Sequence, residues 1–314
     1  RGWTADGLVE MLYPNTVIAG SSGSGYEELL NRDIKFQGYG NNYDFMYIAI
    51  RRPDGLVGKP PSAANEVFDM DNPGDGTAPS YETSTVNVVD FALMKILSGS
   101  NSFAPARLTQ GSRVKTNSSD ASASFPHTYD FDYQNGWSDF GQAGSYMSWM
   151  WKRNAGFDVM CWIGNDNVGR QIPHSLGRVP EMIWIKKRTQ TGNWIAGHKG
   201  MNGGTNPWQY SMQLDSTDAS TDNEWAFNDT APTNIAITLG NDGNCNTTGQ
   251  EYIAMLFASV EGISKCGYYS GDGTDDGSNA ITVGFQPRFL IIKRTDSTGN
   301  WNQFDTVRGL GSGV

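Results

Sequence analysis

The apolar residues of this chain fall into short runs separated by turn-forming residues. The runs at 91–94, 182–185 and 289–292 are each continuously apolar over four residues, which is typical of strands that are buried on both faces. Tight turns such as Asn135-Gly136 and Asp242-Gly243 lie between such runs and favour hairpins. No long stretch has helical spacing. The pattern therefore predicts an all-β fold, and so many short strands joined by tight turns favour a β-sandwich.

Internal repetition organises these strands. The segment from Ile183 to Trp194 is identical at six of twelve positions to the segment from Leu290 to Trp301, which lies 107 residues later. Self-similarity at a fixed interval indicates a repeat architecture. Two further markers, a tyrosine-led strand and a polar turn, recur in the same order: the strands begin at Tyr47, Tyr146 and Tyr252, and the turns begin at Leu12, Val114 and Met212.

The markers predict tandem β-sandwich repeats of about 100 residues, with boundaries just after each tyrosine-led strand. The predicted units are the C-terminal half of one repeat (1–54), two full repeats (55–155 and 156–261) and the N-terminal half of a further repeat (262–314). The chain is thus expected to begin and end in mid-repeat. We expect each repeat to bury its own core between two sheets, like beads on a string. The stretch from Leu56 to Thr85, which contains Pro, Ser and Gly, is predicted to be a linker or loop.

Composition and charge narrow the classes of function. Charged residues make up 18% of the chain, against roughly 25% in ordinary soluble proteins. The net charge is −10 and the basic residues occur as isolated pairs, whereas a nucleic-acid-binding protein needs a basic stripe. No apolar run approaches 18 residues, so we expect no membrane insertion. The three cysteines lack CxxC spacing, and nothing in their spacing requires a disulfide or a zinc site.

Four segments form a recurring pattern: Ile172 to Arg188 with Trp194 and His198, the closing strand Tyr252 to Phe257, the loop Tyr269-Ser-Gly-Asp-Gly, and Leu290 to Gly309. Together they resemble a repeat that occurs in tail-fibre and other structural proteins of tailed bacteriophages, especially marine phages and cyanophages. The first full unit departs from this pattern because it lacks the Gly-Asn-Trp turn. The resemblance covers nearly the whole chain and implies jelly-roll or concanavalin-like β-sandwiches.

The resemblance implies a virion structural protein, a tail-fibre or appendage subunit that is not an enzyme. Its partners would be other virion proteins and further copies of itself in a homo-oligomer, and its location would be the extracellular particle. One alternative is a carbohydrate-binding module that recognises a receptor glycan on the host surface. A second alternative is a polysaccharide depolymerase tailspike, which would need two carboxylates across a cleft.

Two groups of residues are candidates for binding. Acidic turns would supply some of the oxygen ligands that calcium needs, although they lack EF-hand spacing and Asp is also an ordinary turn residue. Apart from calcium, no cofactor is expected. Trp137 and Trp208, which stand next to Gly136 and Pro207, are candidates for exposed contacts with a sugar. The calcium candidates are Asp69, Asp71 and Asp75 in one turn, and Asp272, Asp275 and Asp276 in another.

No catalytic constellation stands out. The sequence has no Gly-x-Ser-x-Gly elbow, P-loop or His-Glu-x-x-His motif. His174 has no evident carboxylate or nucleophile partner in the sequence, so we interpret it as a structural histidine at the start of a strand.

Overall fold

The computed structural model describes residues 61–72, 78–97, 99, 101–125, 128–139, 146–274 and 279–310. It also describes the backbone of four short strands nearer the N-terminus. These strands form two hairpins, β1 (Leu8–Met11) with β2 (Ser21–Ser24) and β3 (Glu27–Leu29) with β4 (Ile34–Phe36).

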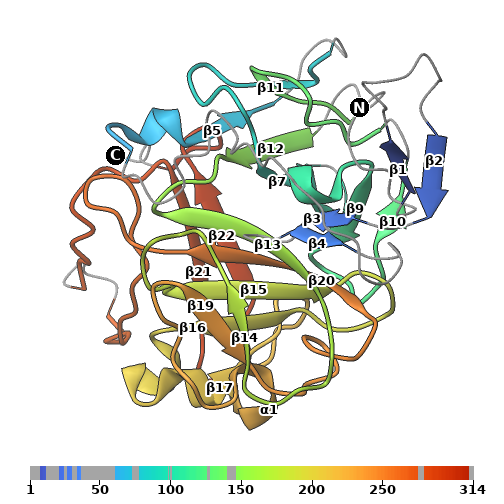
Figure 1. Cartoon of the computed structure of the whole chain (residues 1–314). Coiled ribbons are helices and arrows are strands. Elements are labelled where there is room, and N and C mark those ends of the chain that lie inside the picture. Colours follow the sequence, from blue (N-terminus) through green and yellow to red (C-terminus); the bar gives the residue numbers. More distant parts are fainter. Residues whose placement is uncertain are drawn as a thin grey trace.

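The prediction of an all-β fold is confirmed (Figure 1). The named strands pair antiparallel throughout, and no helix among the described residues is long and apolar enough to cross a membrane. The helical elements are single turns: α1 (Glu224–Phe227), η1 (Ala64–Glu66), η2 (Arg107–Thr109), η3 (Met201–Gly204) and η4 (Pro207–Gln209).

The segment predicted as the first full repeat (55–155), called the first unit below as 156–261 is called the second, contains a six-stranded sheet. Its strand order is β10-β9-β8-β7-β12-β5, so the first strand of the unit pairs with its tyrosine-led last strand at one end of the sheet. Trp151 at the end of β12 lies opposite both Phe68 and Phe91. The strands are β5 (Phe68–Asp71), β7 (Phe91–Ile96), β8 (Ser102–Pro105), β9 (Ser112–Lys115), β10 (Ala123–Ser124) and β12 (Tyr146–Trp151).

The second full unit has a four-stranded sheet with the corresponding order, β13-β20-β15-β16. Phe257 at the end of β20 lies opposite both Phe157 and Met182, which is the register of the first unit. The final hairpin repeats the pairing of β15 with β16, since Met182 pairs with His198 and Phe289 pairs with Asp305, in each case 107 residues later. The strands are β13 (Phe157–Ile163), β15 (Met182–Lys187), β16 (Ile195–His198), β20 (Glu251–Phe257), β21 (Phe289–Lys293) and β22 (Trp301–Asp305).

Small two-stranded sheets accompany both large sheets. The pair β6–β11 lies in the first unit, and the pairs β14–β19 and β17–β18 lie in the second. Gly136 allows the close approach of β11 to β6, because a Cβ atom there would lie 2.0 Å from the carbonyl oxygen of Tyr81. The strands are β6 (Tyr81–Glu82), β11 (Gly136–Trp137), β14 (Arg170–Pro173), β17 (Tyr210–Ser211), β18 (Thr221–Asp222) and β19 (Ala236–Leu239).

Each unit has a hydrophobic core of its own. Trp137 packs with Met94 and Met150 in the first unit, and Trp162 packs with Ile183 and Ile237 in the second. Each of these cores lies between a large sheet and the segments that cover its outer face.

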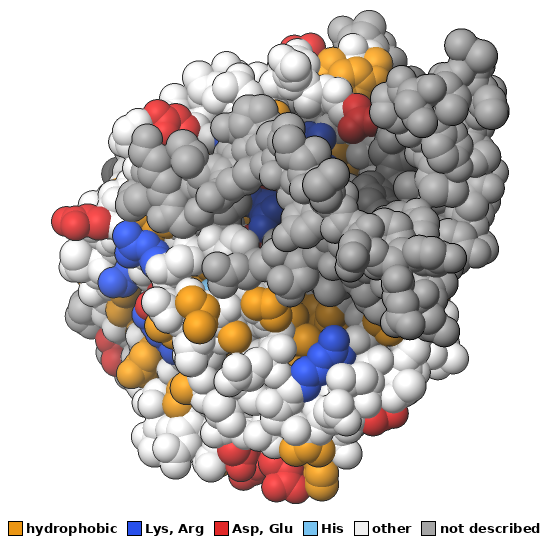
Figure 2. All heavy atoms as spheres, viewed as in Figure 1, with side chains coloured by type: hydrophobic (Ala, Val, Ile, Leu, Met, Phe, Trp, Pro, Cys, Tyr) orange, Lys and Arg blue, Asp and Glu red, His pale blue; other side chains and the backbone are white. Residues whose placement is uncertain are grey.

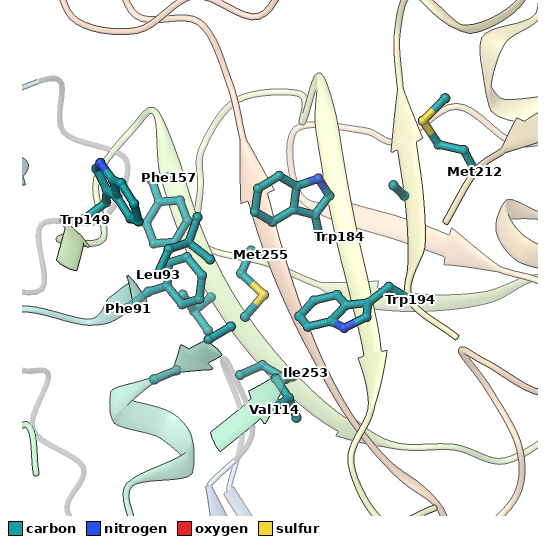
Figure 3. Packing of buried hydrophobic residues seen from close by; sticks show 14 of the residues in the cluster. Phe91, Leu93, Val114, Trp149, Phe157, Trp184, Trp194, Met212, Ile253 and Met255 are labelled. Carbon is teal, nitrogen blue, oxygen red and sulfur yellow. The ribbon is translucent and has the colours of Figure 1, made fainter. Parts of the chain in front are cut away.

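A third core is shared between the units, so the expectation of independent beads is wrong. Phe91 and Trp149 of the first unit belong to the same buried cluster as Trp184 and Met255 of the second (Figure 3). Phe289 of the final hairpin packs against this cluster. The inner faces of the two large sheets carry too many aromatic side chains to be left in water, since each aromatic ring buries about 150–250 Å². They cover one another instead.

The predicted linker from Leu56 to Thr85 is also corrected by the structure. Among its described residues, β5 is the edge strand of the six-stranded sheet and β6 belongs to a smaller sheet. The run Phe68-Asp-Met-Asp71 alternates apolar and acidic residues, so it lacks the continuous apolar signature on which the prediction relied. Val67 and Met70 are buried there.

Candidate functional site

The second unit docks on the first through its β15–β16 hairpin. The Nζ of Lys186 donates a hydrogen bond to the carbonyl oxygen of Ser119 at 3.0 Å, and the backbone N–H of Gly192 donates to the same oxygen at 2.9 Å. The Nε1 of Trp194 donates to the carbonyl oxygen of Lys115 at 2.7 Å. The hairpin therefore binds a turn of the preceding unit through hydrogen bonds to the backbone carbonyl oxygens of that turn.

The final hairpin makes the same contact with the second unit. The Nζ of Lys293 donates to the carbonyl oxygen of Thr217 at 3.2 Å, and the N–H of Gly299 donates to the same oxygen at 2.9 Å. The Nε1 of Trp301 donates to the carbonyl oxygen of Gln213 at 3.1 Å. Each hairpin residue lies 107 positions after its counterpart in the first contact, and each turn residue lies 98 positions after its counterpart. We call this contact the repeat clamp.

The lysine of the repeat clamp is buried in the first contact. Lys186 has no exposed surface, and burial lowers the pKa of its ammonium group to about 8, an effect that Asp215 and Asp120 partly oppose. Burial also lowers the pKa of Lys293, which is more exposed. A buried ammonium group needs acceptors for its protons, and the carbonyl oxygens of the turn provide them.

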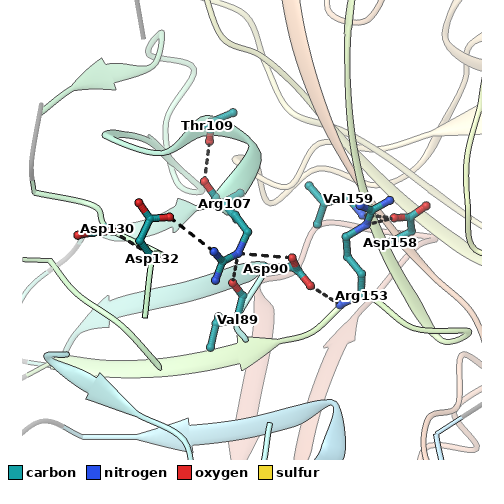
Figure 4. A network of polar contacts seen from close by, with 10 residues as sticks. Val89, Asp90, Arg107, Thr109, Asp130, Asp132, Arg153, Asp158 and Val159 are labelled. Atoms are coloured by element: carbon teal, nitrogen blue, oxygen red, sulfur yellow. Dashed lines mark hydrogen bonds and ion pairs between the residues drawn. The ribbon is translucent and has the colours of Figure 1, made fainter. Parts of the chain in front are cut away.

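Two buried aspartates, Asp90 and Asp158, hold the chain at the junction between the two full units (Figure 4). Asp90 of the first unit is buried and accepts a hydrogen bond from the backbone N–H of Arg153 at 2.8 Å. The Nε of Arg153 in turn donates to the carboxylate of Asp158 at 2.5 Å, and the Nε of Arg107 lies 3.7 Å from Asp90. The chain is therefore held on both sides of the predicted boundary at 155.

The second unit has an equivalent arrangement at its own end. Glu181 lies 91 positions after Asp90, pairs with the Nζ of Lys199, and accepts the N–H of Ser259 at 2.7 Å. Hydrogen bonds from Lys199 and Ser259 lower the pKa of Glu181 although burial opposes this shift. The two units thus share polar contacts as well as strand order.

A cavity of about 310 Å³ lies where the two full units and the final hairpin meet. Leu93, Trp184 and Ile291 line it from equivalent positions of β7, β15 and β21. The lining also includes Met94, Lys95, Ser102, Thr116, Asn117, Trp149, Leu214, Trp301, Gln303 and Arg308.

The polar groups of this cavity have a distinctive chemistry. The Nε1 of Trp184 and the Nε2 of Gln303 are buried and have no hydrogen-bond partner among the described residues. Lys95 and Arg308 supply positive charge, and no carboxylate occurs among the described residues that line the cavity. Trp149 and Trp184 are only 1% and 2% exposed, so these indoles and the two buried nitrogen atoms are closed to solvent.

A family model described as a domain of unknown function, DUF7483, matches residues 93–312. The chain belongs to this family. The match covers more than two thirds of the chain, begins within β7 and extends past the final hairpin, so it leaves out β5. No curated protein and no solved structure matches the chain.

The predicted calcium residues that the structure describes are engaged with the backbone. Asp69 accepts the N–H groups of Met70 at 3.0 Å and Ser84 at 2.9 Å, and Asp158 makes the equivalent bonds in the second unit. Asp71 accepts the N–H of Glu82 at 2.8 Å. Through these hydrogen bonds, both aspartates connect β5 to the segment that follows it.

The second acidic turn gives a similar result for its described residue. Asp272 accepts the N–H of Thr274 at 3.0 Å, which is a local turn bond. Asp75, Asp275 and Asp276 lie outside the described residues. Within the described part of the chain, no three His, Cys, Asp or Glu side chains gather as metal ligands, and calcium binding stays a prediction.

The predicted exposure of the two tryptophans is wrong. Trp137 has no exposed surface and Trp208 is 7% exposed. Trp137 stacks on Phe131 with ring centroids 5.2 Å apart, and its Nε1 donates to the hydroxyl of Ser148 at 3.0 Å. Trp208 packs edge-on against Phe227. Neighbouring Gly and Pro residues suggested loops, but both indoles fill cores.

His174 occupies a structural position, as its surroundings show. The ring is 1% exposed, its Nε2 lies 3.1 Å from the carbonyl oxygen of Thr233, and its Nδ1 accepts the N–H of Leu176. Sequence reasoning missed the repeat-clamp lysines and Gln303. The lysines were visible as identical residues at the 107-residue interval, whereas nothing in the sequence distinguished Gln303.

Proposed function

We propose that the chain is a structural protein of a tailed-phage virion, a tail-fibre or appendage subunit. It is built of tandem jelly-roll or concanavalin-like β-sandwich repeats, complete at 55–155 and 156–261 and half-represented at 1–54 and 262–314. The observation that carries this proposal is the repeat clamp, which is made twice with equivalent residues. The sequence resemblance supports the placement of this structural protein in a virion.

A repeated head-to-tail contact between units is what a structural protein of repeating units needs. Each unit offers a hairpin to the unit before it and a turn to the unit after it, so one interface serves every junction. The contact uses backbone carbonyl oxygens as acceptors, which leaves the side chains of the turn free to vary. Units with divergent sequences can then join in the same geometry.

The shared core adds rigidity to this arrangement. Two sheets and a hairpin cover one another's apolar faces, so bending between the units would expose buried aromatic surface. A shaft or spacer that positions other virion proteins needs such stiffness. The face in Figure 2 carries its Lys and Arg side chains in small separate groups, which suits protein partners and copies of this chain better than a nucleic acid.

The virion role is tested on particles of a phage that encodes this chain. Mass spectrometry of purified virions should find the chain at a symmetric copy number, and antibody labelling in electron micrographs should place it on an external appendage. A chain that is absent from purified particles would overturn the proposed role.

The repeat clamp is tested on the isolated chain. Changing Lys186→Met together with Lys293→Met removes the clamp ammonium groups and keeps the apolar stems. Thermolysin should then cleave the chain at the junctions several-fold faster. Lys265→Met is the matched control, because Lys265 is exposed, and its cleavage rate should equal that of the unchanged chain. Equal rates for all three proteins would contradict the structural importance of the clamp.

A further inference from the structure

An exposed tryptophan of the second unit lies in an open, shallow hollow that the structural role proposed above does not use. Trp225 is 53% exposed, and it lines the hollow together with Asn241, Asp242 and Gly243. We infer that this hollow binds a neutral pyranose, a sugar residue without a charged substituent. This inference goes beyond the proposed function and does not depend on the virion assignment.

The backbone that carries the indole is fixed. Ala226 and Phe227, which follow Trp225 in α1, are buried in the core of the second unit. The carbonyl oxygen of Trp225 accepts the N–H of Asp242 at 2.9 Å, and that of Ala226 accepts the N–H of Gly240 at 3.2 Å. A Cβ atom at Gly240 would lie 2.3 Å from the carbonyl oxygen of Trp225, so the loop packs directly on α1. A ligand would therefore not have to order this backbone.

The loop that forms the other side of the hollow is fixed as well. The carboxylate of Asp242 accepts the N–H of Asn244 at 2.7 Å and the Nδ2 of Asn223 at 3.1 Å. The side chain of Asn246 is buried, and its Nδ2 donates to the carbonyl oxygen of Gly240 at 2.9 Å. Both sides of the hollow are therefore formed before any ligand arrives, which favours binding.

The groups at the surface of the hollow are open to a ligand. Asn241 is exposed, and within the described part of the chain neither its side-chain amide nor the indole N–H of Trp225 has a hydrogen-bond partner. One aromatic ring bordered by polar groups is far smaller than the roughly 800 Å² that a stable protein partner covers. A pyranose has the complementary form, because its C–H face packs on an indole and its hydroxyl groups exchange hydrogen bonds with an amide.

The charge around the hollow favours a neutral sugar. Glu224, next to Trp225, is exposed, and Asp242 lines the hollow. Figure 2 shows hydrophobic and acidic side chains exposed together at the lower end of the molecule, where α1 lies. A sugar carboxylate or sulfate would be repelled there, whereas hydroxyl groups donate hydrogen bonds to carboxylates. Cages for organic cations use several aromatic rings, and Trp225 is the one aromatic residue among the described residues that line the hollow.

Titration of the full chain with small sugars tests the inference. Indole N–H signals are followed by nitrogen-15 NMR, and the signal of Trp225 is the one that disappears in Trp225→Phe. The probes are the methyl glycosides of glucose, galactose and mannose, with glucuronic acid and glucosamine as charged counterparts. At least one neutral glycoside should shift the Trp225 signal with a millimolar dissociation constant, as expected for a small ligand on an open surface. Glucuronic acid should bind at least fivefold more weakly, and glucosamine no more tightly.

The inference would be overturned if no neutral glycoside shifted the signal at tens of millimolar. Binding of glucuronic acid equal to that of the neutral glycosides, or tighter binding of glucosamine, would overturn the neutral class of ligand.

Variants locate the binding, which is measured by saturation transfer to the sugar protons. Trp225→Ala should abolish it, and Asn241→Ala should weaken it several-fold, the effect of one hydrogen bond. Tyr269→Ala is the matched control, because Tyr269 is also 53% exposed but lies outside the hollow, and it should bind the sugar like the unchanged chain. If Trp225→Ala fails to fold, Asn241→Ala decides the matter. Unchanged binding in Asn241→Ala, or an equal loss in Tyr269→Ala, would refute the assignment.

Discussion

Replacing Phe91 by alanine tests whether the two full units are held together by the shared core. Phe91 has no exposed surface, and its ring stacks on that of Phe157 in the second unit with centroids 5.6 Å apart. Removing a buried phenylalanine ring costs about 3–5 kcal/mol, through lost burial and the cavity that remains. Because both units contribute to this core, the loss should lower the free energy of opening of the second unit as well.

A cysteine in the second unit reports on this coupling. Cys245 is fully buried, and burial raises the pKa of its thiol well above the usual value, so a thiol reagent reacts with it only after the unit opens. A loss of about 3 kcal/mol corresponds to a rate of modification about a hundredfold higher, since each 1.4 kcal/mol is a factor of ten. The reference protein carries Cys161→Ala and Cys266→Ala, so that Cys245 is the reporter.

The matched control is another Phe→Ala change in the same unit. Phe125 is 38% exposed, and its replacement should change the rate of Cys245 modification by less than about fivefold, as is usual for surface positions. The coupling would be refuted if Phe91→Ala melted the first unit, seen as loss of far-ultraviolet circular dichroism, while Cys245 reacted at its original rate. That result would mean that the units are independent beads after all.

Three further predictions concern single groups. Trp194→Phe removes the hydrogen bond to the carbonyl oxygen of Lys115 and should lower the free energy of unfolding by about 1 kcal/mol. Trp301 is more exposed, so Trp301→Phe should lower this free energy less. Urea denaturation measures both losses, and a larger loss for Trp301→Phe would contradict the argument from burial. Burial lowers the pKa of His198 to about 4. In the unfolded chain this pKa is near 6.5, so the unfolded state binds the proton first and the free energy of unfolding should fall by about 2 kcal/mol between pH 6.5 and pH 4. His198→Gln should flatten this dependence on pH, and an unchanged dependence would contradict the role of His198. Burial raises the pKa of Asp139 to about 6, so this carboxyl loses its proton more readily in the unfolded chain. The contribution of Asp139 to the free energy of unfolding therefore declines as the pH rises from about 4 to 6. Asp139→Asn should stabilise the protein at pH 7 by about 1–3 kcal/mol, as measured by thermal denaturation, and a lower melting temperature would contradict the unfavourable burial of this carboxylate.

The fold class could be predicted from the sequence because the strands carry strong local signals. The runs 91–94, 182–185 and 289–292 all lie in strands, and the Gly-Asn turns before Trp194 and Trp301 close hairpins. The edge strand β5 could not be found in this way. Its acidic residues accept backbone N–H groups from the chain that follows, and such bonds depend on tertiary structure.

The candidate site was harder to predict than the fold. Trp137 and Trp208 stand beside Gly and Pro, which suggested exposed loops, but burial is decided by what packs on a residue and local sequence does not encode that. The cavity arises where three equivalent strands meet, so its lining comes from residues up to about 200 positions apart. Positions such as Gln303 gain their chemistry only from this assembly.

The repeat clamp also bears on how such a chain can change its length during evolution. Both junctions in the described part of the chain join a hairpin of one unit to a turn of the unit before it, and they use equivalent residues. Recombination between equivalent points of two copies would insert or delete one complete unit and leave a junction of the same type. Crossovers at non-equivalent points would instead separate Lys186 or Lys293 from its acceptors. Selection on the clamp therefore favours changes of length in steps of one whole repeat.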